Sequence, residues 1–184
     1  MSAEITVKIN SDKKTVISLF KKAGYNITRQ WTQISTYWTH LNITETVDYK
    51  TLITNSILIR QEEKSPTLIY KNKQFDNKGN VIAEEQTKQY IQSTKTANKI
   101  FKLAGFKNWV TMTAEQMIFT KGKNEFCIQD VENLGLYLEA ENRNGETLEE
   151  LISFAKKLNL PLDNDFVGVK LPYLVYLKKT HFYQ

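Results

Sequence analysis

Cysteine, histidine and long apolar runs are scarce in this 184-residue sequence, and each shortage excludes a class of protein. A single cysteine, Cys127, cannot form an internal disulfide, which fits a reducing compartment, and we expect a cytoplasmic protein. The two histidines, His40 and His181, are too isolated to suggest a histidine-based metal site. No apolar run approaches the ~18 residues of a transmembrane helix, and no apolar signal core follows the first residues. The sequence therefore predicts neither a membrane anchor nor an export signal.

Charge is also limited, because the net charge is only +5 and the lysines are scattered along the chain. No RNP motif, zinc-ligand spacing or helix-turn-helix pattern accompanies them, which argues against nucleic acid as the partner. A basic outer surface that binds polyanions or another protein stays open as one class of function. Length and ordinary composition predict one globular domain over residues 1–184, and they leave a homodimer open.

The chain repeats itself loosely. Residues 19–25 (LFKKAGY) are echoed by residues 100–106 (IFKLAGF), and each segment closes an amphipathic pattern that predicts a helix, over 12–22 after Ser11 and over 94–104 after Ser93. Further helices are expected over 147–158 and 171–179. Strands are expected over 4–10, 28–42, 55–62, 67–73, 81–91, 109–113, 116–121, 125–131 and 136–141. Two similar halves predict a fold with pseudo-twofold symmetry.

The most informative segment is 124–141 (NEFCIQDVENLGLYLEAE), which alternates as two strands around a turn at 132–135. Period-2 geometry places Glu139 and Glu141 on one face. Two adjacent carboxylates repel each other unless they are solvated or bind a cation. On the first strand, Glu4 and Lys8 likewise share a face. These charged side chains lie either on a solvated outer face or in one polar interior.

The segments resemble the CYTH family, which contains class IV adenylyl cyclases, thiamine triphosphatases and inorganic triphosphatases. The family opens with Glu-x-Glu-x-Lys, and this chain has Glu4, Thr6 and Lys8 in that spacing. Four further family patterns are matched in order by residues 33–38 (QISTYW), 57–60 (ILIR), 68–71 (LIYK) and 128–141. The resemblance runs from about residue 3 to residue 177.

The resemblance implies an α+β fold, in which an antiparallel eight-stranded, tunnel-like barrel with outer helices binds a triphosphate inside. It implies that Lys8, Arg60 and Lys71 hold phosphates, and that Tyr37 and Glu85 also contact the ligand. It further implies that Glu4, Glu139 and Glu141 bind Mg²⁺ or Mn²⁺. The catalytic set would then be Glu4, Lys8, Glu139 and Glu141.

Several family positions are changed in this chain. Neutral residues stand where the family has charged ones, at Thr6, Ser35, Leu58, Ala114, Gln116 and Gln129. The resemblance still leads us to expect metal-dependent binding and hydrolysis of a triphosphate-containing small molecule, a nucleotide or tripolyphosphate. The alternatives are a catalytically degenerate relative that binds a nucleotide or other anion without turnover, and a class IV adenylyl cyclase. Cyclisation is disfavoured because it must also orient a ribose hydroxyl.

Three tryptophans, Trp31, Trp38 and Trp109, have two interpretations. Each could stack on a base, or each could pack beneath an outer helix. Because strand aromatics usually pack, the sequence favours the second interpretation.

Overall fold

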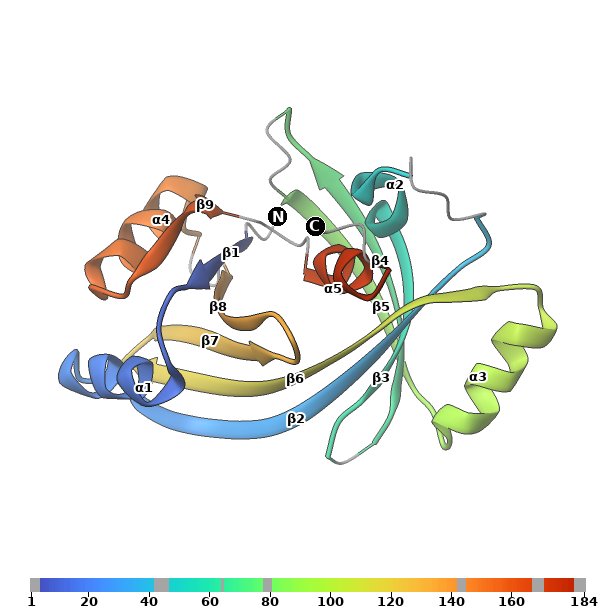
Figure 1. The fold of residues 1–184 in the computed structure, drawn as a ribbon, viewed down its shortest axis with the longest axis horizontal. Helices are drawn as coiled ribbons and strands as arrows, with labels where there is room; N and C mark the ends of the chain where they lie inside the picture. Colours follow the sequence, from blue (N-terminus) through green and yellow to red (C-terminus); the bar gives the residue numbers. More distant parts are fainter. Residues whose placement is uncertain are drawn as a thin grey trace.

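The computed structural model describes residues 4–41, 47–63, 65–77, 81–141, 145–166 and 171–180; residue 42 and His181 lie outside them (Figure 1). The helices are α1 (Lys13–Lys22), α2 (Tyr49–Thr54), α3 (Thr94–Leu103), α4 (Leu148–Lys157) and α5 (Leu171–Lys179). The strands are β1 (Glu4–Ile9), β2 (Asn26–Thr39), β3 (Asn55–Gln61), β4 (Thr67–Phe75), β5 (Val81–Tyr90), β6 (Lys107–Lys121), β7 (Asn124–Val131), β8 (Gly135–Glu141) and β9 (Leu162–Phe166). No helix in these ranges combines the length and apolar character needed to cross a membrane.

The strands form one open antiparallel sheet, in the order β5-β4-β3-β2-β6-β7-β8-β1-β9. The sheet curves strongly, and its concave side faces the middle of the molecule (Figure 1). The α+β class is confirmed, although the described part has nine strands rather than eight. The extra strand, β9, follows Pro161 and pairs with β1, where the sequence predicted no element.

One expected break in the sheet is absent. Separate strands were predicted over 109–113 and 116–121, but β6 runs through both. Ala114 is buried on one face and Glu115 forms an ion pair with Lys13 on the other, so the alternation continues from the first predicted strand into the second.

The sheet order confirms the two-half arrangement. One half is β1-α1-β2-β3-β4 and the other is β5-α3-β6-β7-β8. If each strand is replaced by its counterpart in the other half, the same order of eight strands is obtained, read from the opposite edge of the sheet. The first strand of each half pairs with the last strand of the other half: β1 pairs with β8, and β5 pairs with β4. The residue spacing of Glu4, Thr6 and Lys8 on β1 recurs on β5 as Glu84, Gln86 and Lys88.

Helices α1 and α4 cover the convex face at one end of the sheet. Asp12, rather than the expected Ser11, caps α1 and accepts a hydrogen bond from the Thr15 N–H at 3.0 Å. Phe20 is 1% exposed and stacks on Phe119 of β6 at 4.2 Å between ring centroids. Leu151 of α4 joins the same core. This core fixes which face of β1, β6, β7 and β8 turns inward.

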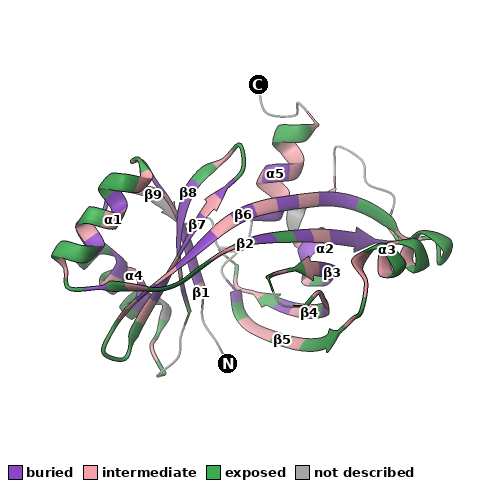
Figure 2. Ribbon diagram, turned by 90° about the horizontal axis from the view of Figure 1, so that it is seen from below, coloured by how far each residue is buried: buried purple, intermediate pink, exposed green. Residues whose placement is uncertain are grey.

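Helix α3 covers the opposite end less completely. None of its described side chains is fully buried, and it is largely exposed in Figure 2. Its Phe101 stacks on Trp38 of β2 at 5.5 Å between ring centroids.

Helices α2 and α5 lie against part of the concave side. Leu171 and Val175 of α5 pack in one core with Leu52 and Ile53 of α2. Figure 1 shows α5 within the curve of the sheet. Because these helices fill only part of the concave side, the remainder forms a cavity.

Candidate functional site

A polar cavity of about 460 Å³ occupies the concave side of the sheet. Its charged lining residues in the described ranges are Glu4, Glu62, Glu84, Glu125, Glu139, Glu141, Arg60, Lys71, Lys73 and Lys88. Six are acidic and four are basic, so the lining is net negative when all are ionised. A polyanion would therefore meet repulsion unless a cation enters with it.

Strand alternation determines which side chains reach this cavity. On β1, Ile5 and Val7 are buried in the outer core, which turns Glu4 and Thr6 inward. On β8, Leu138 and Ala140 enter the same core, so Glu139 and Glu141 face the cavity. The apolar pattern of the sequence is thus the direct cause of the charged interior.

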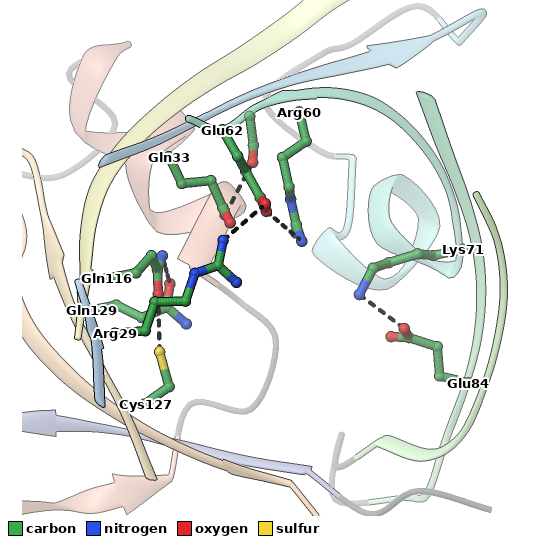
Figure 3. Close-up of polar contacts among 10 residues, drawn as sticks. Arg29, Gln33, Arg60, Glu62, Lys71, Glu84, Gln116, Cys127 and Gln129 are labelled. Carbon is green, nitrogen blue, oxygen red and sulfur yellow. Dashed lines mark hydrogen bonds and ion pairs between the residues drawn. The ribbon is translucent and has the colours of Figure 1, made fainter. Parts of the chain in front are cut away.

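The wall formed by β4 and β5 is basic. Lys71 Nζ lies 2.8 Å from Glu84 Oε1, and Lys73 Nζ lies 2.5 Å from Glu84 Oε2 (Figure 3 shows the Lys71 pair). Burial opposes ionisation of Glu84, but the two lysines outweigh it and lower the pKa of this carboxyl. Lys73 also lies 3.9 Å from Glu4 Oε2 and is only 6% exposed. This pair links β4 to β1 across the cavity.

The wall formed by β1 and β8 is acidic. Glu4 is the register partner of Glu141, and Thr6 is the partner of Glu139. Burial and the neighbouring carboxylates Glu4 and Glu141 raise the pKa of Glu139 to about 8. Burial also raises the pKa of Glu4, although Lys73 and Lys71 oppose that shift. Positive charge introduced beside these groups would favour their ionised forms.

A chain of hydrogen bonds from β6 and β7 fixes the side chain of Glu139. Gln129 Nε2 donates to Glu139 Oε2 at 2.5 Å, and Gln116 Nε2 donates to Gln129 Oε1 at 3.1 Å. The Cys127 thiol donates to Gln116 Oε1 at 3.0 Å (Figure 3). Burial raises the pKa of Cys127, and Glu139 adds to the shift, so the thiol is a hydrogen-bond donor rather than a nucleophile.

One rim of the cavity is formed by β2 and β3. Arg29 Nη2 lies 3.7 Å from Glu62 Oε2, and Arg60 Nη1 lies 4.0 Å from Glu62 Oε1. Figure 3 shows these three side chains converging. The Arg29 guanidinium also lies over the Trp31 ring, 4.0 Å from its centroid.

Most of the predicted site residues meet in this cavity. Its lining includes Glu4, Tyr37, Arg60, Lys71, Glu139 and Glu141. Tyr37 is 8% exposed, and burial raises the pKa of its hydroxyl. The functional roles assigned to these residues remain predictions.

Two predicted residues are placed elsewhere. Lys8 is on the same face of β1 as Glu4 but does not line the cavity, since it lies opposite Tyr137, which belongs to the apolar cluster beneath α5. Glu85 is exposed on the outward face of β5, and its neighbour Glu84 points inward. The pairing of β4 with β5 shifts by one residue between Gln74 and Phe75, and beyond this shift Glu84 rather than Glu85 faces inward.

Other lining residues escaped the sequence analysis. Lys73 had a usable signal, because it lies two residues beyond Lys71 on the same strand face. For Trp31 the sequence allows base stacking but favours packing. Arg29, at the rim, had no signal, since a register shift between Ile27 and Arg29 sets the face that it occupies.

The acidic wall has suitable donors for a divalent metal. In the described ranges, no three acidic, histidine or cysteine side chains are already gathered at metal-binding distance. Mg²⁺, however, commonly takes one or two carboxylates and completes its shell with water and phosphate oxygens. Glu4, Glu139 and Glu141 offer only oxygen donors, and their mutual repulsion would be relieved by a cation. The residues present therefore fit Mg²⁺ or Mn²⁺.

Comparisons with known proteins agree with this architecture. No protein-family model matches the chain. The Methanocaldococcus jannaschii protein named "Putative adenylate cyclase MJ0240" is 30% identical over 170 residues, which cover 89% of this chain and 93% of that protein. A conserved hypothetical protein from Pyrococcus furiosus superposes with a TM-score of 0.68 at 18% identity, covering 91% of this chain and 98% of that one. A Vibrio parahaemolyticus structure described as a putative adenylate cyclase gives 0.60 at 10% identity, covering 90% and 94%.

Proposed function

This chain belongs to the CYTH family of class IV adenylyl cyclase-like proteins, and we propose from that premise that it binds and hydrolyses a triphosphate-containing small molecule with Mg²⁺ or Mn²⁺. The supporting observation is the opposition of two walls in one cavity. Lys71 and Lys73 face inward from β4, and Glu139 and Glu141 face inward from β8. A metal–polyphosphate complex carries both charges that such walls attract.

The basic residues would bind and orient the phosphates. Lys71 and Lys73 already hold a carboxylate, Glu84, in a pair of short contacts, and phosphate oxygens have the same charge and acceptor character. Arg60 would hold a second phosphate from β3. In hydrolysis, water adds to the terminal phosphorus, the phosphoanhydride P–O bond breaks, and orthophosphate leaves with the oxygen of that water. Orienting the phosphates for in-line attack is the main task of these side chains.

The acidic residues would hold the metal. Glu4, Glu139 and Glu141 are the proposed ligands, and Gln129 fixes one oxygen of Glu139 through its hydrogen bond. When bound there, Mg²⁺ or Mn²⁺ supplies positive charge against the charge that develops on the phosphates.

Adenylyl cyclisation is the second candidate, because the archaeal relative carries that name. It requires a group that orients the ribose hydroxyl. The corresponding family Asp is Ser35 here, which is fully buried and accepts a hydrogen bond from Gln33 at 3.4 Å. Without a carboxylate at that position, water is the better-supported nucleophile. Ligand binding without turnover is the third outcome that an experiment must separate.

Phosphorus-31 NMR with ATP, and separately with tripolyphosphate, tests the proposal when Mg²⁺ or Mn²⁺ is present. Orthophosphate should form with wild-type protein, and Glu139→Ala should lower the rate by roughly a hundredfold or more. Glu85→Ala is the matched control, because Glu85 is exposed on the outer face of β5. Its rate should equal that of the wild type.

The other products are equally informative. Formation of pyrophosphate and cyclic AMP from ATP would show that the protein catalyses cyclisation and not hydrolysis. Broadened ligand lines without products would indicate binding alone. Unchanged spectra with both ligands, or equal rates in the two variants, would contradict the proposed site.

A further inference from the structure

Trp31 differs from the other two tryptophans in its surroundings. Trp38 stacks on Phe101 of α3, and Trp109 packs between Tyr37 and Tyr176, at 5.6 and 6.0 Å between ring centroids. Trp31 instead lines the cavity from β2. The expectation that all three pack beneath outer helices is therefore wrong for Trp31, and Trp109 packs against α5 on the concave side instead. Its ring has no structural partner comparable to those of Trp38 and Trp109 among the described aromatic contacts.

The group that does lie on Trp31 is held loosely. The guanidinium of Arg29 lies over the ring at 4.0 Å, and a guanidinium is planar like an aromatic base. The Arg29 side chain is 51% exposed, and its 3.7 Å separation from Glu62 exceeds hydrogen-bond distance. Such exposed ion pairs contribute little, so Arg29 can leave the ring at small cost. Trp31 thus presents a face that already accommodates a planar group.

Two donors near this rim lack acceptors. In the described part of the chain, the buried N–H groups without a hydrogen-bond partner are Trp31 Nε1, Arg60 Nε and Trp38 Nε1. The first two belong to cavity-lining residues on neighbouring strands, whereas Trp38 stacks on α3. Buried donors normally find acceptors. A ligand that brings oxygen acceptors past Arg60 toward Trp31 would supply them.

We infer that Trp31 is the platform for the organic part of the ligand, on which a planar heteroaromatic ring such as a nucleoside base stacks in place of the Arg29 guanidinium. Oxygen atoms of the attached sugar meet the Trp31 N–H group, and phosphate oxygens meet the Arg60 Nε–H group. The inference rests on the proposed function, since the phosphates must be bound between the charged walls. It assigns the cavity a nucleotide-like ligand rather than bare polyphosphate.

Affinity measurements with two ligands test this platform. Isothermal titration calorimetry with ATP and with tripolyphosphate, each with Mg²⁺, gives two dissociation constants for every variant. Trp31→Ala should raise the Kd for ATP about tenfold or more, because stacking on a base is lost. The Kd for tripolyphosphate should stay within about twofold, since the phosphates do not contact the ring. Trp31→Phe retains a ring and should fall between.

Trp38→Phe is the matched control, because it makes the same change on the outer face and should leave both affinities unaltered. Quenching of tryptophan fluorescence by ATP should likewise disappear in Trp31→Phe and persist in Trp38→Phe. An unfolding midpoint for each variant separates loss of binding from loss of fold.

The failures are distinguishable. If Trp31→Ala weakens both ligands equally, or neither, the platform is rejected while phosphate binding stands. If wild-type protein binds neither ligand, the proposed function fails and the platform fails with it.

Discussion

Glu139 occupies an unfavourable position for an ionised carboxylate. It lies two residues from Glu141 on β8 and diagonally across from Glu4 on β1, and its pKa of about 8 leaves it largely protonated at neutral pH. Only Gln129 donates a hydrogen bond to it in the described contacts. Carboxyl groups with strongly raised pKa values cluster at functional sites. This property supports a ligand-binding role for Glu139 rather than a stabilising one.

The raised pKa predicts how stability depends on pH. Below pH 4.5, Glu139 is protonated in both the folded and the unfolded chain. Between about 4.5 and 8 the unfolded chain releases a proton that the folded chain keeps, so the free energy of unfolding falls as pH rises, and it levels off above 8. We expect a loss of about 2 kcal/mol, less than a full shift of this size implies, because water reaches the cavity.

Urea unfolding at pH 5, 7 and 9 measures this loss. Glu139→Gln should flatten the profile relative to the wild type, while Glu85→Gln should keep it. Parallel profiles for all three proteins would show that Glu139 ionises normally.

Alternation and the family resemblance together made most of the cavity predictable at this scale. Alternation placed Glu139 and Glu141 on one face of their strand, and the resemblance selected Glu4, Arg60 and Lys71. Glu84 was missed in favour of Glu85, because a register shift moves the inward face by one residue and leaves no mark in composition.

At the scale of elements, α1 and α3 carry nearly the same sequence signature and differ in burial. Phe20 of α1 lies in the core formed with α4 and the convex face of the sheet. Phe101, its counterpart in the repeat, stacks on Trp38 at the edge of α3, a helix with no fully buried side chain in the described part. The echo in sequence therefore conceals a difference in packing.

This difference predicts unequal costs for the same substitution. Phe20→Ala should lower the free energy of unfolding by about 4 kcal/mol, because it empties a close-packed site. Phe101→Ala should cost about 1–2 kcal/mol, because its site is already partly solvated. Urea denaturation of the two variants measures both values, and equal losses would show that α3 is packed as tightly as α1.

Element positions were predictable where a local signal was strong. Capping and charge placed α4, since Thr147 and Glu150 form a capping box and Lys156 and Lys157 occupy the last turn. The six-residue α2 was not predicted, because a segment containing Tyr, Thr and Ile has no helical bias. It is helical because Leu52 and Ile53 pack beneath α5, a contact distant in sequence.

For the whole molecule, the two halves have the same strand arrangement but carry side chains of opposite charge at corresponding positions. On β8, Glu139 and Glu141 pair in register with Thr6 and Glu4 of β1, and on β4, Lys71 and Lys73 pair with Gln86 and Glu84 of β5. The pseudo-twofold arrangement therefore places an acidic pair and a basic pair at corresponding positions. The cavity therefore presents groups of both charge signs on opposite walls.

Ligand-induced stabilisation should accordingly require both components. At about 100 times its Kd, a bound ligand adds roughly 2.7 kcal/mol, which for a protein of this length raises Tm by about 5–10 °C. We expect that rise with tripolyphosphate and Mg²⁺ together, and less than half of it with either alone, because a phosphate chain without a cation meets the carboxyl groups of the acidic wall. Differential scanning fluorimetry measures the shifts, and a full rise with tripolyphosphate alone would contradict the two-wall arrangement.

The pairing of β1 with β8 has a consequence for synthesis. A ribosome delivers Glu4 first, then Arg60, Lys71 and Lys73, and only much later Glu139 and Glu141. Until translation reaches β8, the nascent chain carries Lys71 and Lys73 with their ion-pair partners Glu4 and Glu84, but it lacks the second half of the acidic wall. The acidic wall can form only once the opening strand meets a strand made more than a hundred residues afterwards.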